Sequence, residues 1–226
     1  MRLATLFFCI LVCLRGDTLK EILDRMDADA VKFKGVTAKL SQLEFTKVIG
    51  ETEKKDGSLT LMKVKNGVVA LVDYTSPDPS QWLLRGGQAQ QFLPKLNLIQ
   101  EYDLGKHSSV VNEFLTLGFG ASGKELQKNY RVDFKGVEVL KVGSAEVTVT
   151  KLELTPKSTE AQQYMKKIEF WIPDGKSYAV QLKIYQPSGN TNTTLYSAVQ
   201  VNPPALNEHS IELKVPKGVK RDKINK

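Results

Sequence analysis

The residue types that most often carry catalysis are sparse in this sequence. There are two histidines, His107 and His209, and they lie in different halves of the chain. Neither is accompanied by a second histidine or by a cluster of carboxylates at the spacing of metal ligands. No G-x-S-x-G sequence marks a serine nucleophile, and the acidic residues are scattered without pairing. We therefore expect a protein that is not an enzyme and that uses no metal ion or cofactor.

One stretch, Gly118-Phe-Gly120-Ala-Ser-Gly123, matches the G-x-G-x-x-G pattern of dinucleotide-binding proteins. That pattern binds a pyrophosphate where it joins a strand to a long helix within a parallel βαβ unit. Here it follows a helical stretch, and the surrounding strands are expected to be antiparallel. We interpret it as a flexible hinge between two short helices.

Both cysteines, Cys9 and Cys13, fall within an N-terminal segment that has the features of a secretory signal peptide. A basic residue is followed by an apolar run that is too short to span a bilayer. Cleavage near the small residue Gly16 would separate the signal peptide, 1–16, from a single cysteine-free domain, 17–226. The segment predicts an exported protein.

The charge of the chain is mildly basic. The formal net charge of +7 falls to +5 when Arg2 and Arg15 leave with the signal peptide, because 30 of the 32 basic residues then remain against 25 acids. This charge is spread along the chain, so nucleic acid is not an expected partner. We interpret the densest basic run, 217–226, as a frayed terminus, with weak attraction to anionic lipid as the alternative.

Three helical segments are predicted. The first covers 18–34, where Thr18 and Glu21 have the spacing of a capping box and apolar residues recur with helical periodicity. The second covers 109–117. The third begins at Ser122, again with a glutamate at capping-box spacing, and extends to residue 128.

The rest of the chain predicts an antiparallel sheet of about ten or eleven strands, because short apolar runs alternate with tight-turn sequences. They are expected within the runs 36–45, 58–65, 68–74, 81–84, 90–93, 130–134, 137–142, 146–154, 168–172, 178–185, 195–201 and 211–215. Three of them, 68–72, 82–84 and 168–172, are apolar on both faces. An antiparallel sheet usually has one face in water, so these runs indicate either an ordinary sandwich core or a sheet wrapped around an apolar cavity.

A series of short motifs, in order, resembles the bacterial outer-membrane lipoprotein carrier proteins, the LolA family. The series runs over most of 18–222 and is as follows: Phe33-Lys-Gly35, Gly57-x-Leu59-x-Leu61, Tyr74-Thr-Ser-Pro77, Phe92-Leu-Pro94 with Tyr102, Tyr130-Arg-Val132, Leu152-Glu-Leu154-Thr-Pro156, Ile168-Glu-Phe170-Trp171-Ile172-Pro-Asp174 and Ile211-x-Leu213-x-Val215-Pro216.

The resemblance implies a fold and a function. The fold is mainly β with some α, a curved, incomplete antiparallel β-barrel (a half-barrel) with a helical lid over a hydrophobic cavity. The function is that of a monomeric periplasmic chaperone. It would take lipoproteins from an inner-membrane ABC transporter, hold their acyl chains in the cavity, and carry them to an acceptor at the outer membrane. The alternative is a periplasmic lipid-binding, sensor or regulatory protein with the same fold and another ligand.

The resemblance also implies which residues would line the cavity. From the first helix, the lid and the sheet, these are Leu19, Leu23, Met26, Val69, Leu71, Trp82, Leu84, Phe92, Val110, Val111, Phe114, Leu115, Phe170 and Ile172. Better-known carriers hold the lid with an arginine in an L-W-x-K-R-P segment. Here the nearest match is Lys65, which lacks the planar fork of donors, so we expect a weaker or different latch.

Overall fold

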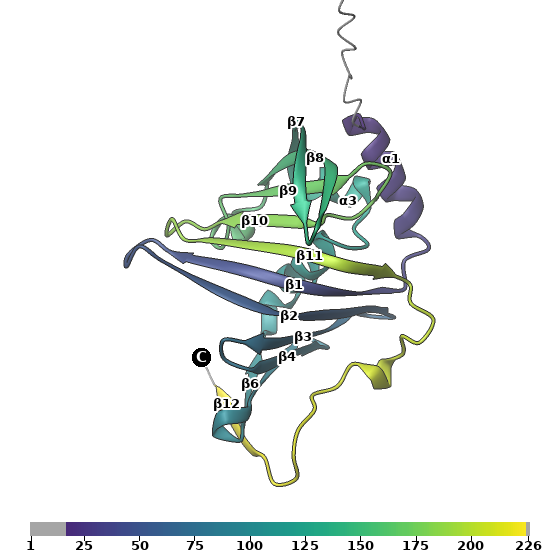
Figure 1. Cartoon of the computed structure of the whole chain (residues 1–226). Helices are drawn as coiled ribbons and strands as arrows, with labels where there is room; N and C mark the ends of the chain where they lie inside the picture. Colours follow the sequence, from purple (N-terminus) through teal and green to yellow (C-terminus); the bar gives the residue numbers. More distant parts are fainter. Residues whose placement is uncertain (1–16, 225–226) are drawn as a thin grey trace, which may run out of the picture.

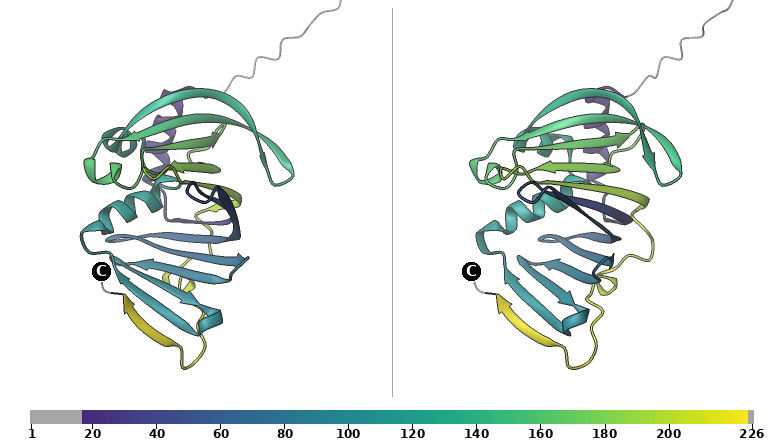
Figure 2. Two further views of the ribbon diagram at one scale, coloured as in Figure 1. Left: turned by 90° about the vertical axis from the view of Figure 1, so that its left-hand side faces the viewer. Right: turned by 60° about the vertical axis from the view of Figure 1, so that its left-hand side comes forward.

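Twelve strands form one curved sheet in the computed structural model, which describes residues 17–224. Their order is β12-β6-β5-β4-β3-β2-β1-β11-β10-β9-β8-β7, and β12 and β7 are its two edges. Figures 1 and 2 show a strongly curved sheet whose edges do not meet. The prediction of an open half-barrel with helical elements is therefore confirmed.

The sheet consists of two meanders joined at its centre. The strands are β1 (Gly35–Thr46), β2 (Glu51–Val64), β3 (Gly67–Ser76), β4 (Ser80–Arg85), β5 (Gln88–Leu93), β6 (Leu98–Asp103), β7 (Tyr130–Val142), β8 (Ala145–Pro156), β9 (Lys167–Pro173), β10 (Gln181–Tyr185), β11 (Thr191–Val201) and β12 (Lys220–Ile224). Antiparallel pairing of β1 with β11 connects the meander β1–β6 to the meander β7–β11. Strand β6 was not among the expected strands, and it pairs with β5.

Both predicted capping boxes form. The longer helices are α1 (Leu19–Ala30), α2 (Ser108–Leu117) and α3 (Gly123–Asn129), with a short α4 (Thr159–Gln162) and the 3-10 turns η1 (Pro94–Leu96), η2 (Gly105–His107) and η3 (Glu208–Ser210). Thr18 caps α1 through Glu21, and Ser122 caps α3 through Glu125. Helix α1 is shorter than the expected 18–34.

The three longer helices pack on the inner face of the sheet. Buried residues of α1 and α3, including Ile22 and Leu126, form one cluster with inner-face residues of β8, β9 and β10. Helix α2 crosses the remaining opening, and Figure 2 shows it inside the curve of the sheet. None of the helices within residues 17–224 is long and apolar enough to span a bilayer.

The segment that follows β11 covers part of the outer face (yellow in Figure 1). Ile211, which is fully buried, packs there on Val69 and Leu71 of β3. The expected strand 211–215 is wrong: this segment is not part of the sheet. The expected frayed tail is also wrong as far as residue 224, because Lys220–Ile224 pairs with β6 in parallel as β12.

Two hairpins differ in extent from the prediction. Strand β2 begins at Glu51 rather than at residue 58, so the β1–β2 hairpin projects well beyond the neighbouring strands (Figure 1). The expected strands 130–134 and 137–142 are one strand, β7, whose register with β8 shifts between Phe134 and Gly136.

The predicted signal peptide and both cysteines lie outside the described residues.

Candidate ligand-binding cavity

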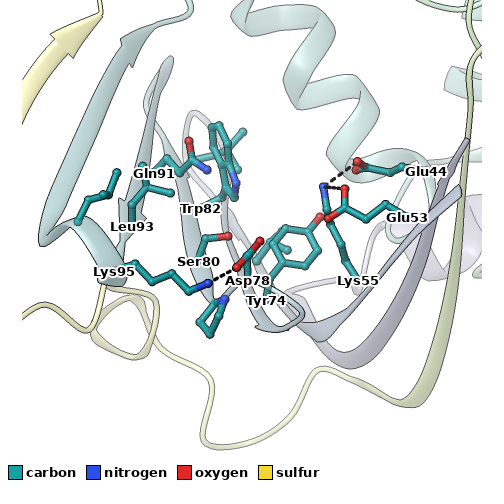
Figure 3. A pocket seen from close by; sticks show the side chains of 14 residues that line it. Glu44, Glu53, Lys55, Tyr74, Asp78, Ser80, Trp82, Gln91, Leu93 and Lys95 are labelled. Carbon is teal, nitrogen blue, oxygen red and sulfur yellow. Dashed lines mark hydrogen bonds and ion pairs between the residues drawn. The ribbon is translucent and has the colours of Figure 1, made fainter. Parts of the chain in front are cut away.

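An open groove of about 740 Å³ lies on the inner face of β2, β3, β4 and β5. Its floor is made by side chains that project from alternate positions of these strands and from η1 (Figure 3). The apolar and aromatic residues that line it are Val72, Tyr74, Trp82, Leu84, Leu93 and Leu96. The ring of Trp82 stacks on that of Tyr102 at a centroid distance of 5.8 Å. The volume and the apolar floor are typical of sites for small apolar ligands.

Charged residues form the rim of the groove, and each has a partner of opposite charge. Lys55 Nζ lies 2.7 Å from Glu44 Oε2 and 3.2 Å from Glu53 Oε2, and Lys95 pairs with Asp78 (Figure 3). Partial burial disfavours the charged form of Lys55, but its hydrogen bonds to the two glutamates outweigh burial and raise its pKa. The rim charges are therefore largely compensated within the protein.

A second, enclosed chamber of about 140 Å³ continues the groove beneath α2. Val72 and Tyr74 line both spaces, so the groove and the chamber meet at β3. Residues of α2 and of the turn after it form one wall of the chamber, and side chains of β1, β2, β3, β10 and β11 form the rest. The apolar and aromatic members are Leu40, Leu59, Val72, Tyr74, Phe114, Leu115, Leu117, Phe119, Leu182, Ile184 and Tyr196.

The two tyrosines of the chamber stay neutral over the physiological range. Burial, together with the charge of Glu44, raises the pKa of Tyr74, and burial also raises the pKa of Tyr196. The hydroxyl of Tyr74 donates a hydrogen bond to Gln42 Oε1. The chamber is consequently uncharged, and its lining of aromatic and aliphatic side chains also includes the neutral polar residues Gln42, Asn192 and Thr194.

Four of the residues that the sequence indicated are brought together in this site. Trp82 and Leu84 line the groove, while Phe114 and Leu115 project from α2 into the chamber. Phe114 is 37% exposed, so it stands at the edge of the lid. Its position between solvent and chamber is the one expected of a lid residue.

Val69, Leu71 and Phe92 lie on the wrong side of the sheet for the predicted role. Val69 and Leu71 pack on the outer face against Ile211. Phe92 pairs with Gln81, whose side chain accepts a hydrogen bond from the backbone N–H of Lys214 on the outer face. Side chains alternate along a strand, so a shift of one residue reverses the face. The inner-face residues of β3 are instead Val68, Ala70, Val72 and Tyr74.

The predicted residues of α1 and β9 are core residues. Leu23, Met26, Phe170 and Ile172 are buried together in the cluster beneath α1, and Leu19 packs against its edge. Val110 and Val111 of α2 are half-buried and line neither the groove nor the chamber. The residues of α1 and β9 therefore pack the helices on the sheet and line neither the groove nor the chamber.

Lys65 does not latch the lid. It lies exposed in the turn between β2 and β3, and no side-chain hydrogen bond or ion pair joins it to another residue of the described chain. Helix α2 is held elsewhere. Asn112 packs so closely on Gly67 that a β-carbon there would lie 3.3 Å from its Nδ2. At the start of α2, His107 Nδ1 lies 3.1 Å from the hydroxyl of Tyr164, which follows α4.

Sequence reasoning missed Val72, Tyr74, Leu40 and Leu59 as cavity residues. Their signal was present in the register: Trp82 pairs with Val72 across β3 and β4, and paired residues share a face. Once Trp82 is placed on the inner face, Val72 and Tyr74 follow on the same face and Leu71 is excluded.

Comparison with known proteins finds no matching family model and no matching curated sequence. Solved structures do match. An uncharacterised conserved protein from Thermus thermophilus is similar over 92% of this chain and 100% of its own, with 10% identity and a TM-score of 0.54. MucB of Pseudomonas aeruginosa is similar over 86% of this chain and 62% of its own, with 11% identity and a TM-score of 0.50. The likeness is one of fold.

A LolA superfamily protein from Nitrosomonas europaea is also similar, over 87% of this chain and 98% of its own, with 13% identity and a TM-score of 0.43. A protein of the LolA superfamily, which the sequence motifs resemble, is thus among the structural matches. At these identities no family membership follows, and the function has to be argued from the cavity.

Proposed function

We propose that this protein binds acyl chains of a lipid or lipoprotein in the groove and chamber on the inner face of its sheet. The observation that carries the proposal is that the two spaces adjoin at Val72 and Tyr74 and that both are lined mostly by apolar and aromatic residues. Each methylene that leaves water contributes about 0.8 kcal/mol, so a chain of a dozen carbons gains roughly 10 kcal/mol before the cost of ordering it.

The open side of the groove suits a carrier. A bilayer competes for the same acyl chain, so a carrier needs a binding site that its cargo can leave. The groove is open at its rim, and α2 covers the chamber with Phe114 at its edge. We propose that the chain enters at the groove and that movement of α2 admits it to the chamber.

The wider role follows from the same proposal. The protein would act in the periplasm as a non-enzymatic monomeric carrier, without metal ion or cofactor. It would receive lipoproteins from an inner-membrane ABC transporter and deliver them to the outer membrane. A second candidate is a sensor or regulatory protein. It is supported by the shared fold with MucB, which has been solved in complex with MucA.

The test is to purify the exported protein from its own cells, extract it with organic solvent and identify acyl species by mass spectrometry. We expect stoichiometric acyl species in the wild type and at least a tenfold loss in Phe114→Asp, because the new carboxylate faces the chamber. Phe134→Asp is the matched control. Phe134 is a 46% exposed phenylalanine on β7 that lines neither space.

Two results would contradict the proposal. One is a wild-type protein that carries no acyl species and does not bind a fluorescent fatty acid added in solution. The other is equal loss in the Phe114→Asp and Phe134→Asp variants, which would indicate general damage rather than a blocked chamber. A protein that carries acyl species, with lipoprotein sorting unchanged in cells from which its gene has been deleted, would favour the sensor over the carrier.

A further inference from the structure

A third cavity, of about 450 Å³, lies at the far end of the chamber from the groove. It is bounded by the C-terminal end of α1, the connection between β9 and β10, and the end of β11. Its lining is mixed: Met26, Phe33 and Val199 contribute apolar surface, and polar residues, Lys32 and Lys176 among them, contribute the rest. The proposed acyl-binding site, which consists of the groove and the chamber, does not include this space.

The far cavity and the chamber share one lining residue. Phe119 lines both spaces and is 2% exposed. Its ring lies 4.9 Å from that of Tyr196, which lines the chamber, and 5.9 Å from that of Tyr178, which lines the far cavity. The three rings thus run from one space to the other, and the ring of Phe119 is the middle one.

The backbone around Phe119 is fixed. Its N–H donates to the carbonyl of Thr116 at 2.9 Å, and the carbonyl of Gly118 accepts from the N–H of Ala179 at 3.1 Å. Gly120 has a φ of +85°, and a β-carbon there would lie 2.4 Å from the ring of Phe33. Phe33 therefore packs directly on this turn, and these contacts hold 118–123 in place, although its glycines indicated a flexible hinge.

We propose that Phe119 is the end wall of the acyl-binding space and sets the longest chain that the protein holds. The inference rests on the proposed function and adds the length of the ligand to it. A chain that runs from the groove into the chamber meets the Phe119 ring. With the ring removed, the chamber opens into the far cavity, where the side chains of Met26, Phe33 and Val199 accept further methylenes.

The experiment measures the affinity of the mature protein for saturated fatty acids of 10 to 20 carbons, in steps of two, by displacement of a fluorescent fatty acid. Each added methylene that is buried tightens binding about fourfold, so each step within the cavity tightens it roughly fifteenfold. The affinity of the wild type should rise with chain length up to a certain length, the length limit, and should not rise beyond it. In Phe119→Ala the length limit should be at least two carbons longer.

Phe92→Ala is the matched control, because Phe92 is an equally buried phenylalanine, 5% exposed, on the outer face of the sheet. It should keep the wild-type limit. If Phe119→Ala does not unfold cooperatively, Phe119→Leu retains more of the packing and should move the limit in the same direction. Phe119→Trp, with its larger ring, should lower the length limit.

The outcomes are distinguishable. A folded Phe119→Ala or Phe119→Leu variant with the wild-type length limit overturns the role of Phe119 and leaves acyl binding standing. A wild-type protein that binds none of the fatty acids overturns the proposed function itself. If the length limit moves as far in Phe92→Ala as in Phe119→Ala, the effect comes from loss of stability, and the inference is overturned.

Discussion

Replacing Ile211 with alanine should lower the free energy of unfolding by about 3 kcal/mol and leave the cavity intact. Ile211 is 0% exposed, and the change removes three carbons, which amounts to about 2.4 kcal/mol of lost burial. The void left behind adds to this, since such substitutions in cores cost about 2–5 kcal/mol. We expect the lower part of that range, because the cluster with Val69 and Leu71 is small and near the surface.

The polar contacts of this segment should survive the substitution. Arg85 Nη2 donates to the backbone carbonyls of Ile211 at 2.9 Å and of Glu208 at 3.4 Å, and neither contact uses the isoleucine side chain. Urea denaturation followed by circular dichroism gives the difference in unfolding free energy. The control is Val215→Ala on the same segment, where a side chain that is 36% exposed should change stability by no more than about 0.5 kcal/mol.

A loss below about 1 kcal/mol for Ile211→Ala would refute the reasoning, because it would mean that the C-terminal segment does not stay docked on β3. Fatty-acid affinity provides the second readout. It should be unchanged, since Ile211 and its partners lie on the outer face. A tenfold loss of affinity at unchanged stability would mean that the assignment of the two faces is wrong.

Two further results are expected. Ser122→Ala removes the side chain that accepts from the N–H of Glu125 at the start of α3, and should cost about 1 kcal/mol in urea denaturation. Stability should also fall on acidification. A hydrogen bond from Lys167 lowers the pKa of Glu153, and hydrogen bonds from Lys151, Tyr185 and Lys167 outweigh burial to lower that of Glu169. The stabilisation that these ionised glutamates give the folded state is complete above the ordinary glutamate pKa and is lost as the pH falls through their lowered pKa values. Glu169→Gln should therefore make the free energy of unfolding decline less steeply below pH 5.

The sequence was most informative where local chemistry decides the structure. The capping boxes at Thr18 and Ser122 depend on residues three apart, and both formed as expected. The alternation of apolar residues likewise located most of the strands. These signals depend on residues that are close together in sequence, so they do not depend on the remainder of the molecule.

The faces of the apolar strands could not be assigned in the same way. Strand β3 is apolar at Val68, Val69, Ala70 and Leu71, because α2 and Phe119 cover one face and the C-terminal segment covers the other. A run that is buried on both sides carries no periodicity from which to choose the inner residues. The cover on the outer face comes from a segment near the end of the chain, whose own pattern at 211–215 looked like a strand.

The basic tail was misjudged for a related reason. Its lysines and arginine are typical of a solvated terminus, yet Arg221 pairs with Glu101 and the backbone of 220–224 pairs with β6. Charged side chains are common on edge strands, where they prevent further pairing with other chains. Composition alone does not separate an edge strand from a frayed end.

The pairing of β1 with β11 governs how this chain can fold. The first strand to be synthesised lies at the centre of the sheet, and one of its two neighbours is about 150 residues further along the chain. The meander β1–β6 can assemble from local hairpins, but the edge of β1 remains unpaired until β11 is available. Contacts of such long range slow folding. The newly made chain therefore passes through a stage with an exposed strand edge, in which it is prone to aggregate.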